Sequence, residues 1–340
     1  MSPELSKKIG FFSFLNILLV ILLHSYNAEL MNVRNLNWYV QNFISNGICR
    51  IAVPFFFLIS GFLFFQNIPD SFSCEVFMRK IKRRMWSNAV PYFVIVLVGL
   101  MVCWAVSCFH DGFVSSFTRT FRGALNYIFI SPRLSYQLWF LRDLLVLQLC
   151  SPLLFFVTRQ GILSILLLLV LPLCNVGSYL FDPDPVFFFC MGAVIAGNSL
   201  PSWFGKFLHF NSFCIGASIF IWISSCLLRL FYPMFLIVFL GNISGMIGLW
   251  NLYDKVSRNT RGGFEKVFAT SFFLYLFHEP LMSSLRKLIL LVICPSQAVL
   301  MILYFLLPVT AVLLLEPISF LWKKYFFKSY SFITGGREKK

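Results

Sequence analysis

Residues 298–315 read AVLMILYFLLPVTAVLLL and contain no charged side chain. A helix needs about 20 mostly apolar residues to cross the ~30 Å hydrocarbon core of a bilayer, so this stretch is typical of a membrane span. A second apolar run occupies Ile162–Leu173, and similar runs recur along the 340-residue chain. Hydrophobic residues make up 59% of the chain and charged residues 12%, unlike a soluble domain. The sequence therefore predicts an all-α, polytopic membrane protein.

The apolar runs are long and do not alternate with polar residues, which favours a helical bundle over a β-barrel. We expect about ten membrane helices, at residues 8–26, 48–66, 88–109, 138–157, 161–176, 185–199, 210–228, 232–250, 268–293 and 298–321. The span at 268–293 contains Glu279 and Pro280, and the proline predicts a break in that helix. The aromatic stretch 121–131 is expected at the membrane interface or in a re-entrant position.

Lysine and arginine residues are distributed unevenly between the loops. If the N-terminus is cytoplasmic, 19 of the 28 basic residues fall in cytoplasmic segments, five fall outside and four lie within spans. Cytoplasmic loops of membrane proteins carry this excess of positive charge, so both termini are predicted to be cytoplasmic. The net charge of +15 has the same origin. Without a basic stripe interleaved with aromatic residues on a soluble surface, it does not indicate nucleic-acid binding.

No gap between the predicted spans is large enough for an independent soluble core. One membrane-embedded domain is therefore expected over residues 1–340, with a short basic cytoplasmic tail at 322–340. Residues 10–23 are interpreted as a retained first helix, because no small-residue cleavage site follows them. The ten cysteines form neither CxxC nor a Cys/His ligand spacing, so no metal site is expected. Walker, GxGxxG, GxSxG and HExxH motifs are also absent.

His24 ends the first predicted span. Ser13 lies eleven residues earlier, about three turns, and therefore on nearly the same helix face, with Asn16 close to it. An ionisable group in the hydrocarbon region costs ~2.5–3.5 kcal/mol on insertion scales, so its presence needs a reason. His24 is accordingly a candidate catalytic residue, and Ser13 and Asn16 are candidate binding residues. The alternative for His24 is an interfacial histidine in contact with water.

Two further spans carry polar candidates for substrate binding. Arg50 begins the second span and is either an anchor for an anionic group or a side chain that reaches outward to the interface. Ser60 stands next to Gly61, a pair that permits close helix approach. Arg142 and Asp143 are adjacent and point to different helix faces, so each is expected to find a partner on another helix. A structural ion pair is the alternative for these two residues.

His278 and Glu279 directly precede Pro280 in SFFLYLFHEPL, residues 271–281. Proline leaves a carbonyl one turn earlier without its helical donor, which tends to mark a functional position in a membrane helix. His278 and Glu279 are therefore candidate catalytic residues, with a helix-packing hydrogen bond as the alternative. Glu316, near the end of the last span, is interpreted as the partner of an interfacial basic residue.

Six segments, in this order, resemble the acyltransferase 3 family of integral membrane acyltransferases. They are LVILLH (19–24), VPFFFLISGFLFF (53–65), RKIKRRMWSNAVPYF (79–93), LWFLRDLLVLQLCSPLL (138–154), FFFCMGAVIAG (187–197) and SFFLYLFHEPL (271–281). The resemblance covers essentially the whole chain. It implies transfer of an acyl group, commonly acetyl from acetyl-CoA, to a hydroxyl of a cell-surface glycan or lipid-linked sugar.

The resemblance also implies that His24 is the catalytic histidine. Many members of the family carry an arginine about ten residues before it, and the corresponding residue here is Ser13, so Arg50 and Arg142 are candidates to supply that charge. Acyl-CoA is expected as a co-substrate, with no permanently bound cofactor, and a bacterial inner membrane as the location. A transporter or flippase for a lipid-linked sugar is the alternative function, because broken helices and buried charges fit it equally well.

Overall fold

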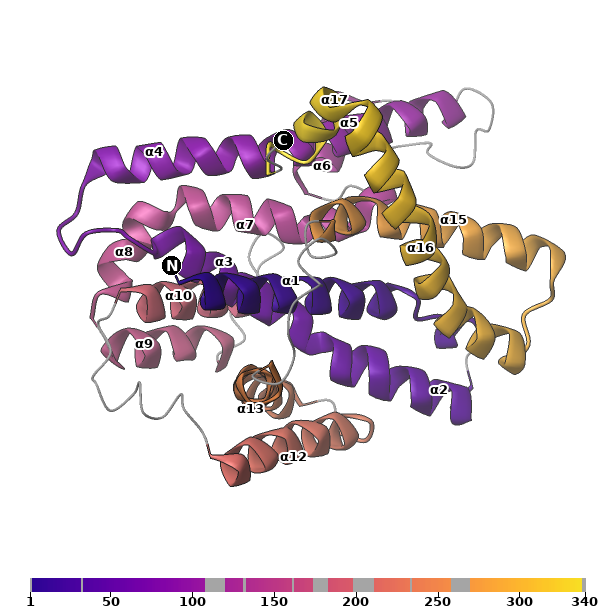
Figure 1. Ribbon diagram of the computed structural model, residues 1–340. Helices are drawn as coiled ribbons and strands as arrows, with labels where there is room; N and C mark the ends of the chain where they lie inside the picture. Colours follow the sequence, from indigo (N-terminus) through magenta and orange to yellow (C-terminus); the bar gives the residue numbers. More distant parts are fainter. Residues whose placement is uncertain are drawn as a thin grey trace.

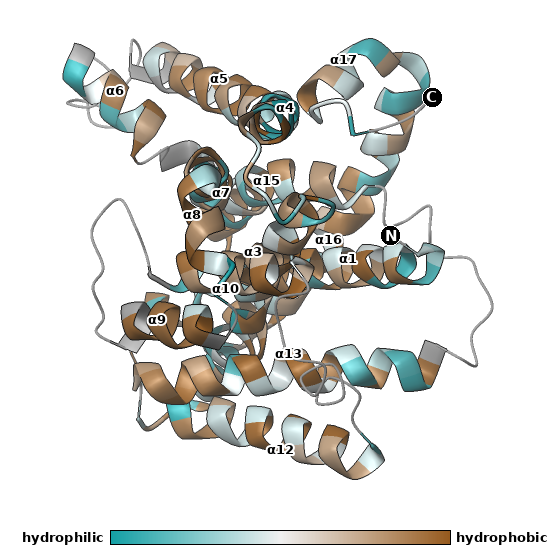
Figure 2. Cartoon of the chain, turned by 90° about the vertical axis from the view of Figure 1, so that its left-hand side faces the viewer, coloured by the Kyte–Doolittle hydropathy of each residue, from teal (hydrophilic) through white to brown (hydrophobic). Residues whose placement is uncertain are grey.

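The computed structural model describes residues 2–31, 33–107, 120–130, 133–160, 162–173, 183–197, 211–232, 234–257 and 270–337. These residues form helices and their connections, and no β-strand occurs among them. The predicted all-α class is confirmed. Figure 1 shows the helices gathered into one bundle, with α1 at its centre. In Figure 2 hydrophobic residues run along most helices, while α4 and the start of α1 carry hydrophilic ones.

The α-helices of these described residues differ widely in length. They are α1 Pro3–His24, α2 Leu36–Gln41, α3 Ala52–Phe65, α4 Cys74–Arg84, α5 Val90–Ser107, α6 Phe121–Phe129, α7 Trp139–Leu149, α8 Ser151–Thr158, α9 Ile162–Leu173, α10 Pro183–Ala196, α12 Ser212–Arg229, α13 Phe235–Ser257, α15 Ser271–Val292, α16 Gln297–Tyr325 and α17 Phe327–Ile333. Short 3₁₀ and π-helical segments connect some of these α-helices. They are the 3₁₀ helices η1 Ala28–Met31, η3 Ile48–Ile51 and η5 Arg133–Leu138, and the π-helices η2 Asn42–Gly47 and η4 Met85–Ala89.

Six helical stretches of the described residues are long and apolar enough to cross a membrane. They are Pro3–Leu30, Leu36–Phe65, Cys74–Val102, Ser212–Arg229, Phe235–Val256 and Gln297–Tyr325. The segments Ser135–Leu149 and Ser151–Thr158, bent by 70° at their junction, would together make a seventh. A polytopic membrane protein follows, whereas the total of ten helices and their sidedness remain predictions.

Two of these stretches begin well before the predicted spans. The span predicted at 48–66 is extended at its start by α2 and η2, and the span predicted at 88–109 is extended by the basic helix α4. The π-turns η2 and η4 join each apolar helix to a more polar helical segment that precedes it. A prediction from hydrophobicity alone therefore places the start of each helix too late. Residues 108–119, which include the end of the second of these predicted spans, lie outside the described residues.

Helices α3 and α10 cross at very close range in the middle of the bundle. A β-carbon added to Gly61 would lie 1.9 Å from the Phe189 carbonyl oxygen, and one added to Gly192 would lie 2.1 Å from that of Leu58. Both obstacles are backbone atoms, which cannot rotate away. The two glycines therefore allow the close approach that the Ser60–Gly61 pair predicts.

Helix α15 runs without interruption through Pro280, so the predicted break at Glu279–Pro280 is wrong. Proline has no N–H, which leaves the Leu276 carbonyl four residues earlier without its helical partner. The Gln137 side chain supplies the missing donor, with its Nε2 2.9 Å from the Leu276 oxygen. A side chain from η5 thus replaces the lost backbone hydrogen bond, and the helix stays continuous.

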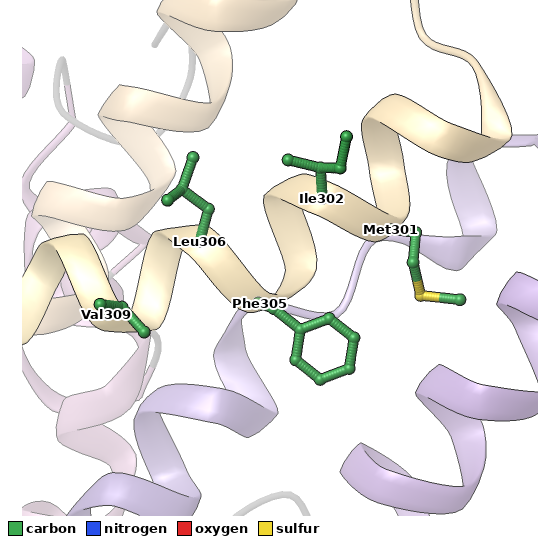
Figure 3. Close-up of a pocket in the computed structure, with 5 residues that line it drawn as sticks. All are labelled: Met301, Ile302, Phe305, Leu306 and Val309. Atoms are coloured by element: carbon green, nitrogen blue, oxygen red, sulfur yellow. The ribbon is translucent and has the colours of Figure 1, made fainter.

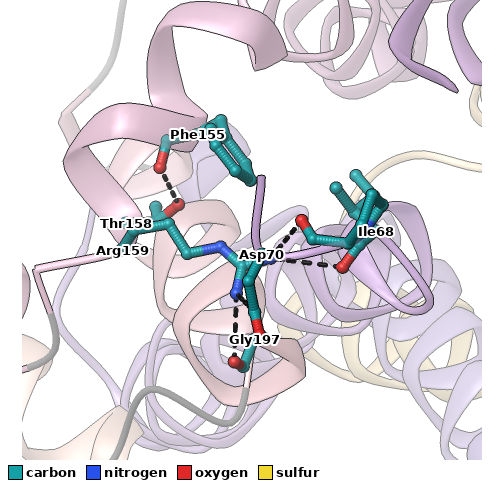
Figure 4. Close-up of polar contacts among 7 residues, drawn as sticks. Ile68, Asp70, Phe155, Thr158, Arg159 and Gly197 are labelled. Atoms are coloured by element: carbon teal, nitrogen blue, oxygen red, sulfur yellow. Dashed lines mark hydrogen bonds and ion pairs between the residues drawn. The ribbon is translucent and has the colours of Figure 1, made fainter. Parts of the chain in front are cut away.

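Two basic residues join helix ends that are distant in sequence. Lys8 of α1 lies 2.6 Å from the Asp254 carboxylate of α13 and 3.9 Å from the centre of the Trp250 ring. Arg159, after α8, pairs with Asp70 and donates to the carbonyls of Ile68, Pro69 and Gly197 (Figure 4). The start of α1 thus meets the end of α13, and the ends of α3, α8 and α10 meet one another.

The segment predicted as a basic tail, 322–340, contains a packed helix. Tyr330 of α17 is buried, and its hydroxyl lies 2.8 Å from that of Ser319 on α16. Gly335 has φ +70°, and an added β-carbon would lie 2.3 Å from the Ser87 carbonyl of η4. Arg337 donates to the Asn88 side chain. Residues 322–337 are therefore fastened to η4, while 338–340 lie outside the described residues.

Candidate active site

His24 and His278 lie side by side in the bundle. Their ring centroids are 5.3 Å apart, with an angle of 53° between the ring planes. His24 is the last residue of α1 and is half-buried, whereas His278 is completely buried in α15. The structure thus brings together the two histidines that the sequence singles out separately. Imidazole is the side chain best suited to move a proton near neutral pH.

The tautomer of His278 is fixed by its surroundings. Its Nδ1 lies 2.9 Å from the Leu274 carbonyl oxygen and 3.0 Å from that of Tyr275, and because both are acceptors, Nδ1 must donate. In the neutral ring Nε2 then carries a lone pair. This Nε2 is buried and has no hydrogen-bond partner among the described residues. Buried polar atoms are nearly always paired, so this one is available for a hydroxyl group.

Segment η5 forms another wall of the site. The Tyr136 ring centroid lies 5.9 Å from that of His24, with 78° between the ring planes, and the Tyr136 side chain is largely exposed. The neighbouring Gln137 is buried, and its Oε1 also has no partner among the described residues. The backbone of η5 is irregular, with Ser135 at φ −134° and ψ 51°. The contact with Tyr136 gives His24 an aromatic neighbour from a second segment.

The polar residues of α1 lie below His24 along the same helix. Ser13 donates to the Ile9 carbonyl at 2.8 Å, so its hydroxyl is occupied within the helix. Asn16 is buried, and its Nδ2 has no partner among the described residues. Of these two predicted binding residues, Asn16 is therefore the one with a polar atom left for a ligand.

Positive charge reaches His24 from two other segments. Arg286 of α15 donates to the Tyr26 carbonyl at 3.0 Å, two residues beyond His24. Arg50 of η3 donates to the Asn46 side chain at 3.2 Å. Both guanidinium groups are close enough to act electrostatically on the His24 ring. Ser13 stands where the family resemblance implies an arginine. Arg286 and Arg50 place positive charge near His24 instead.

Arg142 and Asp143 pair with each other, so the prediction of separate partners on other helices is wrong for this contact. The Arg142 Nε and Nη2 atoms lie 2.8 and 2.7 Å from Asp143 Oδ1. The guanidinium group also donates to the Ile130 carbonyl. The Arg142 side chain is long enough to reach its neighbour despite the angular separation of adjacent residues on a helix. The contact is a structural ion pair, which was the alternative for these two residues.

Glu279 and Ser60 occupy other surroundings. Glu279 is half-buried and interacts electrostatically with Arg286 and Lys287 on its own helix. Ser60 lies in α3 at the crossing with α10. The described contacts do not join either residue to the histidine pair.

Three residues of the site are not among the sequence candidates: Tyr136, Gln137 and Arg286. One signal bears on Gln137, because Pro280 implies a carbonyl that needs a donor from elsewhere. Nothing in the sequence says which segment provides that donor.

An apolar hollow of ≈ 420 Å³ on the outer side of α16 lies apart from these residues. It is lined by Met301, Ile302, Phe305, Leu306 and Val309 (Figure 3). The side chains bear no group able to catalyse a reaction, and such a surface suits lipid hydrocarbon.

Membrane-spanning helices with two neighbouring imidazoles between them define an integral membrane protein whose interior holds groups able to carry a proton. The sequence model of the acyltransferase 3 family, described as an acyltransferase domain, matches residues 14–318. The chain belongs to the acyltransferase 3 family and is a membrane acyltransferase, which confirms the resemblance. Comparison with curated proteins and with solved structures finds no match.

Proposed function

We propose that the protein is an O-acyltransferase that moves an acyl group, most simply acetyl, from acyl-CoA to a hydroxyl of a cell-surface polysaccharide or lipid-linked sugar. The observation that carries this proposal is the His24 ring beside the unpaired Nε2 of His278 in the interior of a membrane bundle of this family. An acyl acceptor must lose a proton, and the two imidazoles offer the bases to take it.

The proposed setting is a bacterial inner membrane, crossed ten times, with both termini in the cytoplasm. The excess of basic residues in one set of loops supports this orientation. Lys8 meets Asp254, and Arg159 meets Asp70 and the Gly197 carbonyl, so segments assigned to the cytoplasmic side also lie together in space. His24, at the far end of α1, would then face the outer half of the membrane.

The acyl-CoA donor would approach from the cytoplasm, where it is made. Arg79, Lys82 and Arg83 are exposed on α4, and they line a hollow of ≈ 670 Å³ together with Trp86. Such a cluster attracts the phosphate groups of CoA. Lys80 of the same helix is engaged with the Phe64 and Gln66 carbonyls at the end of α3, so it anchors the cluster instead of binding the donor.

In the proposed reaction the acceptor oxygen attacks the thioester carbonyl while its proton passes to His24. The C–S bond then breaks, and the CoA thiolate takes a proton from the imidazolium to leave as the thiol. Because His278 Nε2 can only accept, it would bind a neighbouring hydroxyl of the acceptor sugar and could not polarise the carbonyl. A second route forms an acyl-His24 intermediate before transfer to the acceptor.

The His24→Ala variant tests the assignment. Membranes that contain the wild-type protein should transfer radiolabelled acetyl from acetyl-CoA to a cell-surface glycan, and the variant should lose this activity by about 10²- to 10⁴-fold. Glu4→Gln, an exposed change at the start of α1, serves as the control. Acyl transfer at the wild-type rate in His24→Ala would refute the role of His24.

A further inference from the structure

A ladder of side-chain hydrogen bonds runs along one face of the helix that begins at α2. Arg50 donates to Asn46 Oδ1 at 3.2 Å, Asn46 Nδ2 donates to Asn42 Oδ1 at 2.8 Å, and Asn42 Nδ2 donates to the Tyr26 hydroxyl at 2.9 Å. Tyr26 follows His24 by two residues, so one end of the ladder lies just beyond the end of α1. We call these four residues, Tyr26, Asn42, Asn46 and Arg50, the polar ladder.

Arg229 adds a second cation to the polar ladder from the end of α12. Its guanidinium group donates to the Asn46 backbone carbonyl, and its charge interacts with that of Arg50. Within the described parts of the chain, neither Arg50 nor Arg229 forms an ion pair with a carboxylate. Two neighbouring positive charges repel each other, so an anion between them would be bound favourably.

The polar ladder is not sealed inside the protein. Arg50 is exposed, and Tyr26, Asn42 and Asn46 are each partly exposed. Amide and guanidinium groups are expensive to place against lipid tails, so this face borders water or a polar ligand. Asn42 and Asn46 belong to the π-helix η2, a wide turn that is frequent at functional sites.

Exposed aromatic side chains near the polar ladder indicate where it lies relative to the membrane. Tyr39 and Phe231 are exposed, with ring centroids 6.4 Å apart, and Tyr232 beside them is exposed as well. Exposed aromatic residues concentrate at the headgroup level of membrane proteins. A glycan at the membrane surface could therefore reach the polar ladder without crossing the hydrocarbon core.

We propose that the polar ladder and Arg229 form the acceptor subsite, and that the acceptor is a saccharide carrying a carboxylate or phosphate near the acylated hydroxyl. The asparagine side chains bind sugar hydroxyls, and Arg50 with Arg229 binds the oxyanion. This assignment rests on the proposed acyltransferase function, because it identifies the class of acceptor for the same reaction.

The test measures binding to the purified protein in nanodiscs of phosphatidylcholine, without acetyl-CoA. The probes are a glucuronyl-glucose disaccharide, a phosphorylated disaccharide and neutral cellobiose. The wild-type protein should bind at least one anionic probe about tenfold more tightly than cellobiose, which is the effect of one charge-assisted hydrogen bond. Arg50→Gln should abolish this preference. Arg122→Gln, which removes an exposed positive charge from α6, should keep it.

Equal affinity of the wild-type protein for all three probes would overturn the proposal, as would an unchanged preference in Arg50→Gln. Nanodiscs containing phosphatidylglycerol form a further arm. If that lipid weakens anionic-probe binding in the wild type and has no such effect in Arg50→Gln, the site binds a lipid headgroup and the acceptor assignment fails.

Activity provides the second readout. With an acceptor that is acetylated, Arg50→Gln should raise the KM for the acceptor about tenfold and leave the KM for acetyl-CoA unchanged. A rise in the KM for acetyl-CoA instead would place Arg50 in the donor site and overturn the proposal. Failure of the acceptor-subsite proposal can be told apart from failure of the proposed acyltransferase function. A protein that transfers no acetyl group could still prefer anionic saccharides in the binding assay.

Discussion

His24 and His278 are held in different ways, and the difference bears on the part each can take in acyl transfer. His24 ends α1, is half-buried and has the exposed Tyr136 beside it. His278 is buried and fixed through Nδ1 by two backbone carbonyls. A ring fixed in this way holds its Nε2 lone pair in one direction, whereas the His24 ring has access to a substrate that arrives from outside.

The His278→Asn variant separates these two functions of the ring. The asparagine Nδ2 can replace Nδ1 as the donor to the Leu274 carbonyl, but nothing replaces the Nε2 lone pair. We expect kcat for acetyl transfer to fall by about tenfold, the effect of one lost hydrogen bond, while the melting temperature changes little. Steady-state kinetics and thermal unfolding in detergent measure the two effects. A kcat within threefold of the wild type would show that Nε2 takes no part.

Sequence predicts the two histidines because ionisable side chains stand out in apolar runs. It does not predict Tyr136 or Gln137, since tyrosine and glutamine near the end of a span are common. Arg286 is one of the four basic residues within the predicted spans, but the sequence assigns it no role in the site. These residues become significant only when η5 and α15 are packed against the end of α1. Arg142 and Asp143 show the opposite case: they stand out in sequence, yet in the structure they pair with each other.

At the scale of helices, α15 shows how a proline is accommodated in a membrane bundle. Pro280 lies inside the helix, and Gln137 Nε2 replaces the backbone donor that Leu276 lacks. The compensation comes from a residue that is 139 positions away in the sequence. A local rule correctly predicts the missing hydrogen bond, but cannot predict that a distant side chain restores it and leaves the helix unbroken.

This compensation predicts a coupling between two substitutions. Gln137→Ala leaves the buried Leu276 carbonyl unpaired and should lower the free energy of unfolding by about 1–3 kcal/mol. Pro280→Ala restores an N–H that can bond to this carbonyl. In the Pro280→Ala background, Gln137→Ala should therefore cost about 1 kcal/mol less.

Thermal or denaturant unfolding of the four proteins of the cycle measures this coupling. Gln137→Asn provides a matched control, because it keeps an amide on a shorter side chain. Strictly additive effects would contradict the proposed replacement of the backbone donor.

The arrangement of the whole molecule relative to the membrane can be tested with two native cysteines. Cys74, the first residue of α4, and Cys294, between α15 and α16, are both free and exposed. The proposed orientation places Cys74 in the cytoplasm and Cys294 outside. In intact cells, a membrane-impermeant maleimide should label a variant that retains only Cys294.

A variant that retains only Cys74 should react with the same reagent only after the membrane is permeabilised. Gel-shift detection of a bulky maleimide gives the readout, and a chain without cysteines gives the background. Labelling of Cys74 in intact cells would reverse the proposed sidedness.

At this scale sequence predicts the class well, because hydrophobicity and the distribution of basic residues act on every span at once. It predicts the ends of spans less well. The helix at Cys74–Val102 starts in a hydrophilic segment, and its continuity depends on the π-turn η4 and not on hydrophobicity. The packing of α17 likewise depends on contacts, such as that between Tyr330 and Ser319, which composition does not report.

The contact between Arg337 and Asn88 has a consequence for biosynthesis. The two residues are 249 positions apart, so at the usual ~5–20 residues per second the ribosome needs about 10–50 s to make the chain between them. During this interval α4, η4 and α5 are already synthesised, while the partner that closes over η4 is not. This corner of the bundle therefore closes after translation has passed every predicted span, and membrane insertion must proceed without it.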